Sequence, residues 1–96
     1  MLRAGSAQLE PLSRRATVDG VEVELTRLEF DLLAELAAHP RVVYTRDRLL
    51  EKVWGYQSPV GGKTVDVHVA NLRKKLGDDI GIVAVRGVGY RLEPGP

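Results

Sequence analysis

Between residues 63 and 76, apolar side chains recur with the period of an α-helix. Valine or leucine returns every third or fourth position, which places these side chains on one stripe of such a helix. The other positions are mostly short, polar or basic, and the only acid among them, Asp66, falls near Arg73 on the flank. We therefore predict an amphipathic helix that packs through its stripe and exposes a basic, adaptable face. The stripe consists of Val65, Val69, Leu72 and Leu76.

Two segments before this helix also have helical patterns. Residues 27–38 follow Thr26, and Glu29 stands three positions after that threonine, which is the sequence signature of a capping box. His39-Pro40 ends this segment, because the residue before a proline avoids the helical conformation. A second helix is predicted from Thr45 to about Trp54, with Gly55 as its stop.

The first 25 residues favour short strands at 2–3, 7–10, 15–18 and 21–25. Asp19-Gly20 separates the last two runs, and this dipeptide is a strong signal for a two-residue hairpin turn. We expect a small antiparallel sheet, one face of which must pack against another part of the chain.

A β-hairpin is predicted at the other end of the chain. Residues 80–85 and 90–92 are its arms, and Arg86 stands at the tip, Arg86-Gly87-Val88-Gly89, whose glycines are expected to be flexible. The predicted order is four strands, three helices and a hairpin, which is the order of an α+β winged helix-turn-helix fold. Gly77 is expected to follow the last turn of the helix over 63–76 and to end it.

Composition narrows the classes of function. The 96 residues suit one compact domain over 1–96, and no cysteine is present for a disulfide or a thiolate metal site. His39 and His68 lack spaced partners, so we expect neither a metal nor a cofactor. No membrane span or signal peptide is evident, which favours a soluble, cytoplasmic protein without a membrane partner. No paired carboxylates stand in a pocket-like context and no nucleotide motif is complete, so we do not expect an enzyme.

Charge is distributed unevenly although the net charge is only +1. Residues 1–62 hold eight basic and nine acidic side chains, a balance of −1, whereas residues 63–96 hold six and four, a balance of +2. A local basic patch is enough to attract phosphates, because salt screens charges over about 8 Å. A basic helix face backed by an apolar stripe suits the major groove of DNA.

Several blocks, in this order, resemble the winged-helix effector domain of bacterial two-component response regulators of the OmpR/PhoB type. The resemblance extends from roughly residue 2 to residue 92 and implies a four-stranded N-terminal sheet, three helices and a C-terminal hairpin wing. The blocks are LTRLEFDLL (25–33), TRDRLLEKVWG (45–55), KTVDVHVANLRKKLG (63–77) and VRGVGYRL (85–92).

The resemblance implies sequence-specific binding of double-stranded DNA in transcription regulation. The helix over 63–76 would enter the major groove, with Thr64, Val67, Asn71 and Arg73 toward the bases. Lys63, His68 and Lys74 would lie nearer the phosphates. Arg86 would enter the minor groove, and Tyr90 would support it or touch a phosphate. The chain departs from well-known relatives at Ala70-Asn71, where they carry basic residues.

Partners are also implied by the resemblance. Two copies would bind direct-repeat promoter sites under the control of a receiver domain that this chain lacks, so the chain is an excised effector domain or an unusual regulator. In the family the loop at 56–62 can contact RNA polymerase, here through Tyr56, Gln57, Ser58 and Val60, or it only connects two helices. The alternative from another class is a protein-interaction module that engages RNA polymerase or a partner regulator.

Individual residues also have simpler interpretations. The helix over 63–76 could be an ordinary amphipathic surface helix, and Arg86 could belong to a plain hairpin turn. We favour a partly buried helix-edge role for His68 over a phosphate contact, and a core role for Trp54. Gly61-Gly62-Lys63-Thr64 resembles the tail of a P-loop, but Gln57 replaces the required glycine and no strand precedes it.

Overall fold

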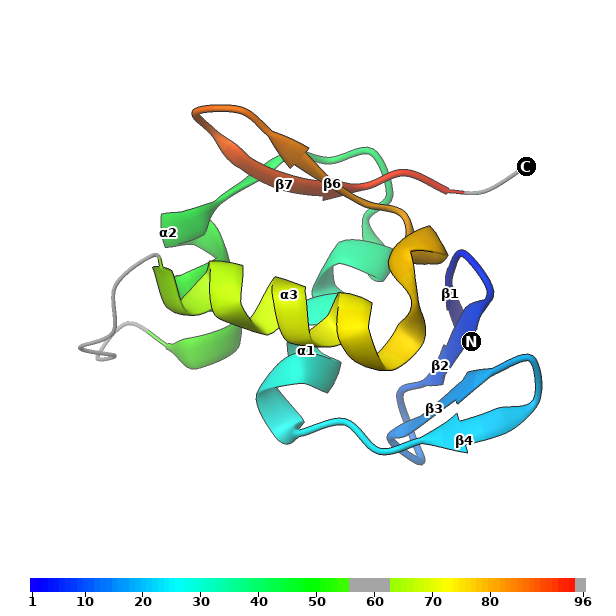
Figure 1. The fold of residues 1–96 in the computed structure, drawn as a ribbon. Helices are drawn as coiled ribbons and strands as arrows, with labels where there is room; N and C mark the ends of the chain where they lie inside the picture. Colours follow the sequence, from blue (N-terminus) through cyan, green and yellow to red (C-terminus); the bar gives the residue numbers. More distant parts are fainter. Residues whose placement is uncertain (56–62, 95–96) are drawn as a thin grey trace.

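The N-terminal strands form one antiparallel sheet in chain order (Figure 1). The computed structural model describes residues 1–55 and 63–94. Its first sheet contains β1 (Leu2–Ala4), β2 (Ala7–Glu10), β3 (Arg15–Val18) and β4 (Val21–Val23). Asp19 and Gly20 have φ values of +50° and +83°, and Val18 pairs with Val21. Positive φ at both central residues defines the mirror-image turn that matches strand twist, so the predicted hairpin is confirmed.

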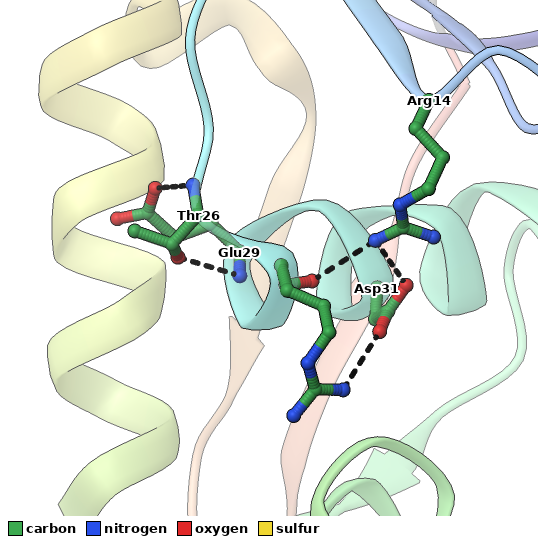
Figure 2. Close-up of polar contacts among 5 residues, drawn as sticks. Arg14, Thr26, Glu29 and Asp31 are labelled. Carbon is green, nitrogen blue, oxygen red and sulfur yellow. Dashed lines mark hydrogen bonds and ion pairs between the residues drawn. The ribbon is translucent and has the colours of Figure 1, made fainter.

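Helix α1 (Arg27–Ala38) begins with the predicted capping box (Figure 2). The Glu29 amide donates to the Thr26 hydroxyl at 3.2 Å, and the Glu29 carboxylate accepts from the Thr26 amide at 2.9 Å. Figure 2 also shows Arg14, from the β2–β3 turn, donating to Asp31 at 2.9 Å. The Arg14 guanidinium lies 4.6 Å from the centre of the Phe30 ring. These contacts attach the first sheet to α1.

The second helix occupies the predicted segment but changes its hydrogen bonding along the way. Thr45 caps α2 (Arg46–Leu49), which continues into a wider π turn, η1 (Leu50–Trp54). The Gly55 amide donates to the Leu50 carbonyl, five residues back, at 2.8 Å. Sequence periodicity gave no indication of this widening. Trp54 packs against the core and is only partly buried, as the core interpretation of this residue expects.

Helix α3 (Lys63–Leu76) lies across α1 in the centre of the molecule (Figure 1). Its buried residues are the four members of the predicted stripe, so the helix and its orientation are confirmed. Gly77, with a φ of +101°, ends the helix and leads into the short η2 (Asp78–Ile80). The stripe joins Leu32, Leu33 and Leu36 of α1 in the core.

A second sheet has three strands, in the order β5-β7-β6. β6 (Ile82–Val85) and β7 (Gly89–Leu92) form the predicted hairpin, whereas β5 (Tyr44–Thr45) was not predicted. Two residues are too few to show a strand period. The order along the chain is therefore four strands, α1, an extra short strand, the two further helices and the hairpin.

The expectation that Gly89 lends flexibility to the hairpin tip is wrong. Gly89 is buried in β7, and a Cβ there would lie 1.9 Å from the Tyr44 carbonyl oxygen. This glycine is needed because β5 approaches its backbone closely. The tip is Arg86, Gly87 and Val88, closed by a 2.9 Å bond from the Val88 amide to the Val85 carbonyl, with Gly87 at a φ of +76°.

Candidate nucleic-acid interface

The outward face of α3 carries most of the residues predicted to contact DNA. Lys63, Val67 and Lys74 are exposed, and Val67 has 56% of its surface accessible. Thr64 and Asn71 lie beside them and are partly exposed. Positions 63, 67, 70 and 74 recur at helical spacing, so the face is continuous along the helix. It has a lysine near each end and an apolar side chain between them.

Arg73 is turned toward the second sheet. Its Nη2 donates a 2.8 Å hydrogen bond to the Ile82 carbonyl, and the residue is partly buried. Asp66 and Arg73 lie seven residues apart in α3, but each forms its hydrogen bonds with residues of other elements: Asp66 with Arg46 and Tyr90, and Arg73 with Ile82. Arg73 therefore anchors β6 against α3, which sequence reasoning did not find.

Asp66 is the centre of a small polar cluster. One of its carboxylate oxygens, Oδ1, accepts from Arg46 Nε at 2.9 Å and from the Tyr90 hydroxyl at 2.6 Å. The Arg46 guanidinium also lies 5.3 Å from the centre of the Tyr90 ring. The hydrogen bond from Tyr90, with the pairing to Arg46, holds the pKa of Asp66 below its ordinary value despite partial burial. Asp66 is therefore a stable carboxylate at neutral pH.

Tyr90 is buried, and its hydroxyl is directed to Asp66. Burial, followed by the hydrogen bond to Asp66, raises the pKa of the phenol above its ordinary value. The two roles expected of Tyr90, support of Arg86 or a contact with a phosphate, stay predictions. No sequence pattern identified Arg46, because its hydrogen-bond partner Asp66 lies 20 residues away along the chain.

His68 lies at the edge of α3, as expected, and is partly buried. Its Nδ1 lies 2.8 Å from the Thr64 carbonyl oxygen, so Nδ1 is the nitrogen that carries a proton. The ring stands nearly perpendicular to Trp54, with centroids 5.0 Å apart. These contacts hold the imidazole against η1. A contact between His68 and a DNA phosphate stays a prediction.

The wing exposes Arg86 at its tip, next to Val88. In the view of Figure 1, the tip of the β6–β7 hairpin points toward the end of the molecule where α3 begins. Within residues 1–55 and 63–94, neither Arg86 nor Lys74 forms an ion pair. Both charges are therefore available to an external anion as far as the described residues are concerned.

The remaining predictions concern the polymerase-contact loop, metal binding and membrane spans. Tyr56, Gln57, Ser58 and Val60, predicted to contact polymerase, lie outside the described residues, as do Gly61 and Gly62. The described part of the chain contains no cluster of three potential metal-binding side chains. None of its helices is both long enough and apolar enough to cross a membrane.

The fold and this face together define a winged helix. A family model described as "Transcriptional regulatory protein, C terminal" matches residues 20–92, and the chain belongs to this family. The DNA-binding response regulator MtrA of Mycolicibacterium smegmatis is 45% identical over 98 residues, which cover 98% of this chain and 43% of that protein. The chain thus spans less than half the length of the curated relatives it matches.

Two solved structures illustrate the likeness in three dimensions. The RstA DNA-binding domain of Klebsiella pneumoniae, solved with the RstA box, is 35% identical with a TM-score of 0.85, covering 98% of this chain and 97% of that one. The CpxR DNA-binding domain of E. coli is 34% identical with a TM-score of 0.84, covering 99% and 97%. The predicted fold class is confirmed by these neighbours.

Proposed function

We propose that this chain binds double-stranded DNA in a sequence-specific manner and thereby regulates transcription in a two-component system. In this proposal α3 enters the major groove and Arg86 of the wing enters the adjacent minor groove. The observation that carries it is the exposed face of α3, where an accessible valine and small polar side chains lie between two lysines. The RstA relative, solved with its DNA box, supports the same use of the fold.

Each side chain on the face has a chemical role in this proposal. Val67 would meet a thymine methyl group, and Asn71 would pair with adenine through two hydrogen bonds. Thr64 would contact a base edge, while Lys63 and Lys74 would neutralise phosphates. Arg86 would occupy a narrow minor groove, where the potential is most negative. For Arg73, Tyr90 and His68, the contacts inside the protein favour support of this face over direct contact with DNA.

Selection of bound sequences from random duplex DNA tests the proposal. We expect a defined half-site to be enriched, and Asn71→Ala to relax the preference at one base pair. Lys52→Ala is the control for charge, because Lys52 is an exposed lysine that lies beside α1 and the first sheet. If selection yields no consensus, or if Asn71→Ala and Arg86→Ala both bind as the unchanged chain does, the interface is elsewhere and a protein-interaction module becomes the better account.

The regulatory setting is a further part of the proposal. Because the chain matches less than half of relatives named as response regulators, we propose that residues 1–96 are one effector module, acting in the cytoplasm under a receiver domain. Two copies would occupy direct repeats. Sedimentation with duplexes that carry one or two selected half-sites tests this: two bound copies are expected only on the second. A contact between residues 56–62 and RNA polymerase rests on the family resemblance alone.

A further inference from the structure

Asp66 is the only acidic residue in a helix whose outer face is otherwise neutral or basic. A carboxylate in the first turn of a DNA-facing helix would repel the phosphates unless its charge were matched. Arg46 supplies this match at 2.9 Å from α2, and the Tyr90 hydroxyl adds a 2.6 Å bond from β7. One carboxylate oxygen thus joins three elements that are far apart in the sequence.

The position of Tyr90 in the hairpin allows its hydrogen bond to Asp66 to influence where the wing lies. Tyr90 pairs with Ala84, the next pair is Gly89 with Val85, and the tip with Arg86 follows directly. Tyr90 is therefore the side chain on β7 nearest the tip that is fixed to a helix. The guanidinium of Arg46, in α2, lies over the Tyr90 ring and holds the Tyr90 side chain from a second helix.

We infer that Asp66 is a positioning residue which, through Tyr90 and Arg46, sets the placement of the wing relative to α3. The inference rests on the proposed function, since the cluster would fix the distance between the major-groove and minor-groove contacts. A fixed distance matters because a wing that has to be ordered on binding would cost affinity. The cluster acts inside the protein and does not touch DNA.

Tyr44 offers a matched comparison within the same sheet. It is the register partner of Tyr90 on β5, is buried to a similar degree, and donates its hydroxyl to a carboxylate, Glu35, at 2.7 Å. Glu35 belongs to α1, however, and not to α3. Tyr44→Phe therefore removes a comparable hydrogen bond without releasing the link between α3 and the wing.

The first arm of the test needs no DNA. The chain has no cysteine, so cysteines introduced at exposed Ala70 in α3 and Val88 in the wing can be spin-labelled selectively. We expect pulsed electron paramagnetic resonance to give a broader or shifted distance distribution in Tyr90→Phe and in the milder Asp66→Asn. Tyr44→Phe should leave the distribution unchanged. If all of these variants give the distribution of the labelled parent, the inference is overturned.

The second arm couples the cluster to binding of the selected duplex. Tyr90→Phe should weaken binding by about tenfold, near the smallest effect expected of one hydrogen bond to a charged group, with circular dichroism showing a folded protein. This loss should largely vanish in an Arg86→Ala background and persist in Lys74→Ala. Additivity with Arg86→Ala, or no loss at all, would overturn the inference. If no duplex is selected, the proposed function fails and the role of the cluster in binding fails with it. If the variants bind DNA normally and their distance distributions do not change, only the inference about the cluster is rejected.

Discussion

Lys75, in the last turn of α3, donates a 2.6 Å hydrogen bond to Glu29, the residue that closes the cap of α1. Glu29 is only 3% exposed, and its Oε1 accepts from both Lys75 and the Thr26 amide. The bond connects the end of α3 to the start of α1 and engages a lysine that would otherwise add to the basic face. Arg73 is engaged in a similar way by Ile82.

Lys75→Met should lower the free energy of unfolding by about 1–2 kcal/mol. Removing the ammonium leaves a buried carboxylate with fewer partners, and partial exposure of the lysine moderates the cost. Urea unfolding at pH 7 measures the change. Lys74→Met is the control, because Lys74 forms no ion pair within the described residues and should change stability little. Equal losses in the two variants would mean that the bond to Glu29 is unimportant.

Glu29 should make stability depend on pH in the acidic range. Burial opposes its ionisation, but hydrogen bonds from Lys75 and Thr26 outweigh burial and hold its pKa below the ordinary value of 4.5. A lowered pKa in the folded state stabilises the fold above the unfolded value, and this stability is lost as the pH falls through the folded value. Glu29→Gln keeps the cap geometry but should flatten this part of the pH profile of urea midpoints. An unchanged slope would assign the acid sensitivity to other carboxylates.

Gly89→Ala should destabilise the wing more than Gly87→Ala. The first substitution places a methyl group 1.9 Å from the Tyr44 carbonyl oxygen, whereas the second meets no atom within 4 Å and strains only a φ of +76°. We expect losses of about 2–4 kcal/mol and about 1 kcal/mol, from overpacking and from the left-handed backbone respectively. Thermal unfolding followed by circular dichroism compares them. The reverse ranking would show that β5 does not approach the wing so closely.

Asn71→Ala and Lys74→Ala should weaken DNA binding in different ways. Loss of the amide should remove about 1–3 kcal/mol of discrimination at one base pair. Loss of the ammonium should weaken binding to all sequences alike and reduce the dependence of log K on log salt by about 1. Titrations of both variants against the selected duplex and its single-base variants separate the two effects. Identical profiles would mean that Asn71 reads no base.

Local patterns in the sequence predicted most of the fold. The stripe of α3, the Thr26–Glu29 cap and the Asp19-Gly20 turn each depend on neighbours within a few residues, and the structure contains all three. The features that were missed depend on distant contacts. Strand β5 exists only because Tyr44 and Thr45 pair with β7, and Gly89 is required only by that pairing.

The candidate site also combines features that local patterns predict with features that depend on distant contacts. Exposure of Lys63, Val67 and Lys74 follows from helical periodicity once the buried stripe is known. The partners of Asp66 could not be inferred, because helical spacing places Arg73 near it whereas tertiary packing brings Arg46 and Tyr90 to its carboxylate.

Titration of the selected duplex at increasing salt concentrations tests the DNA-binding account most directly. The basic side chains placed on this surface are Lys63, Lys74 and Arg86, so log K should fall linearly with log salt at a slope of about −2 to −3. Lys52→Ala should retain this slope, and Arg86→Ala should make it shallower. Affinity that does not change with salt would contradict the assignment of α3 and the wing as the DNA-binding surface.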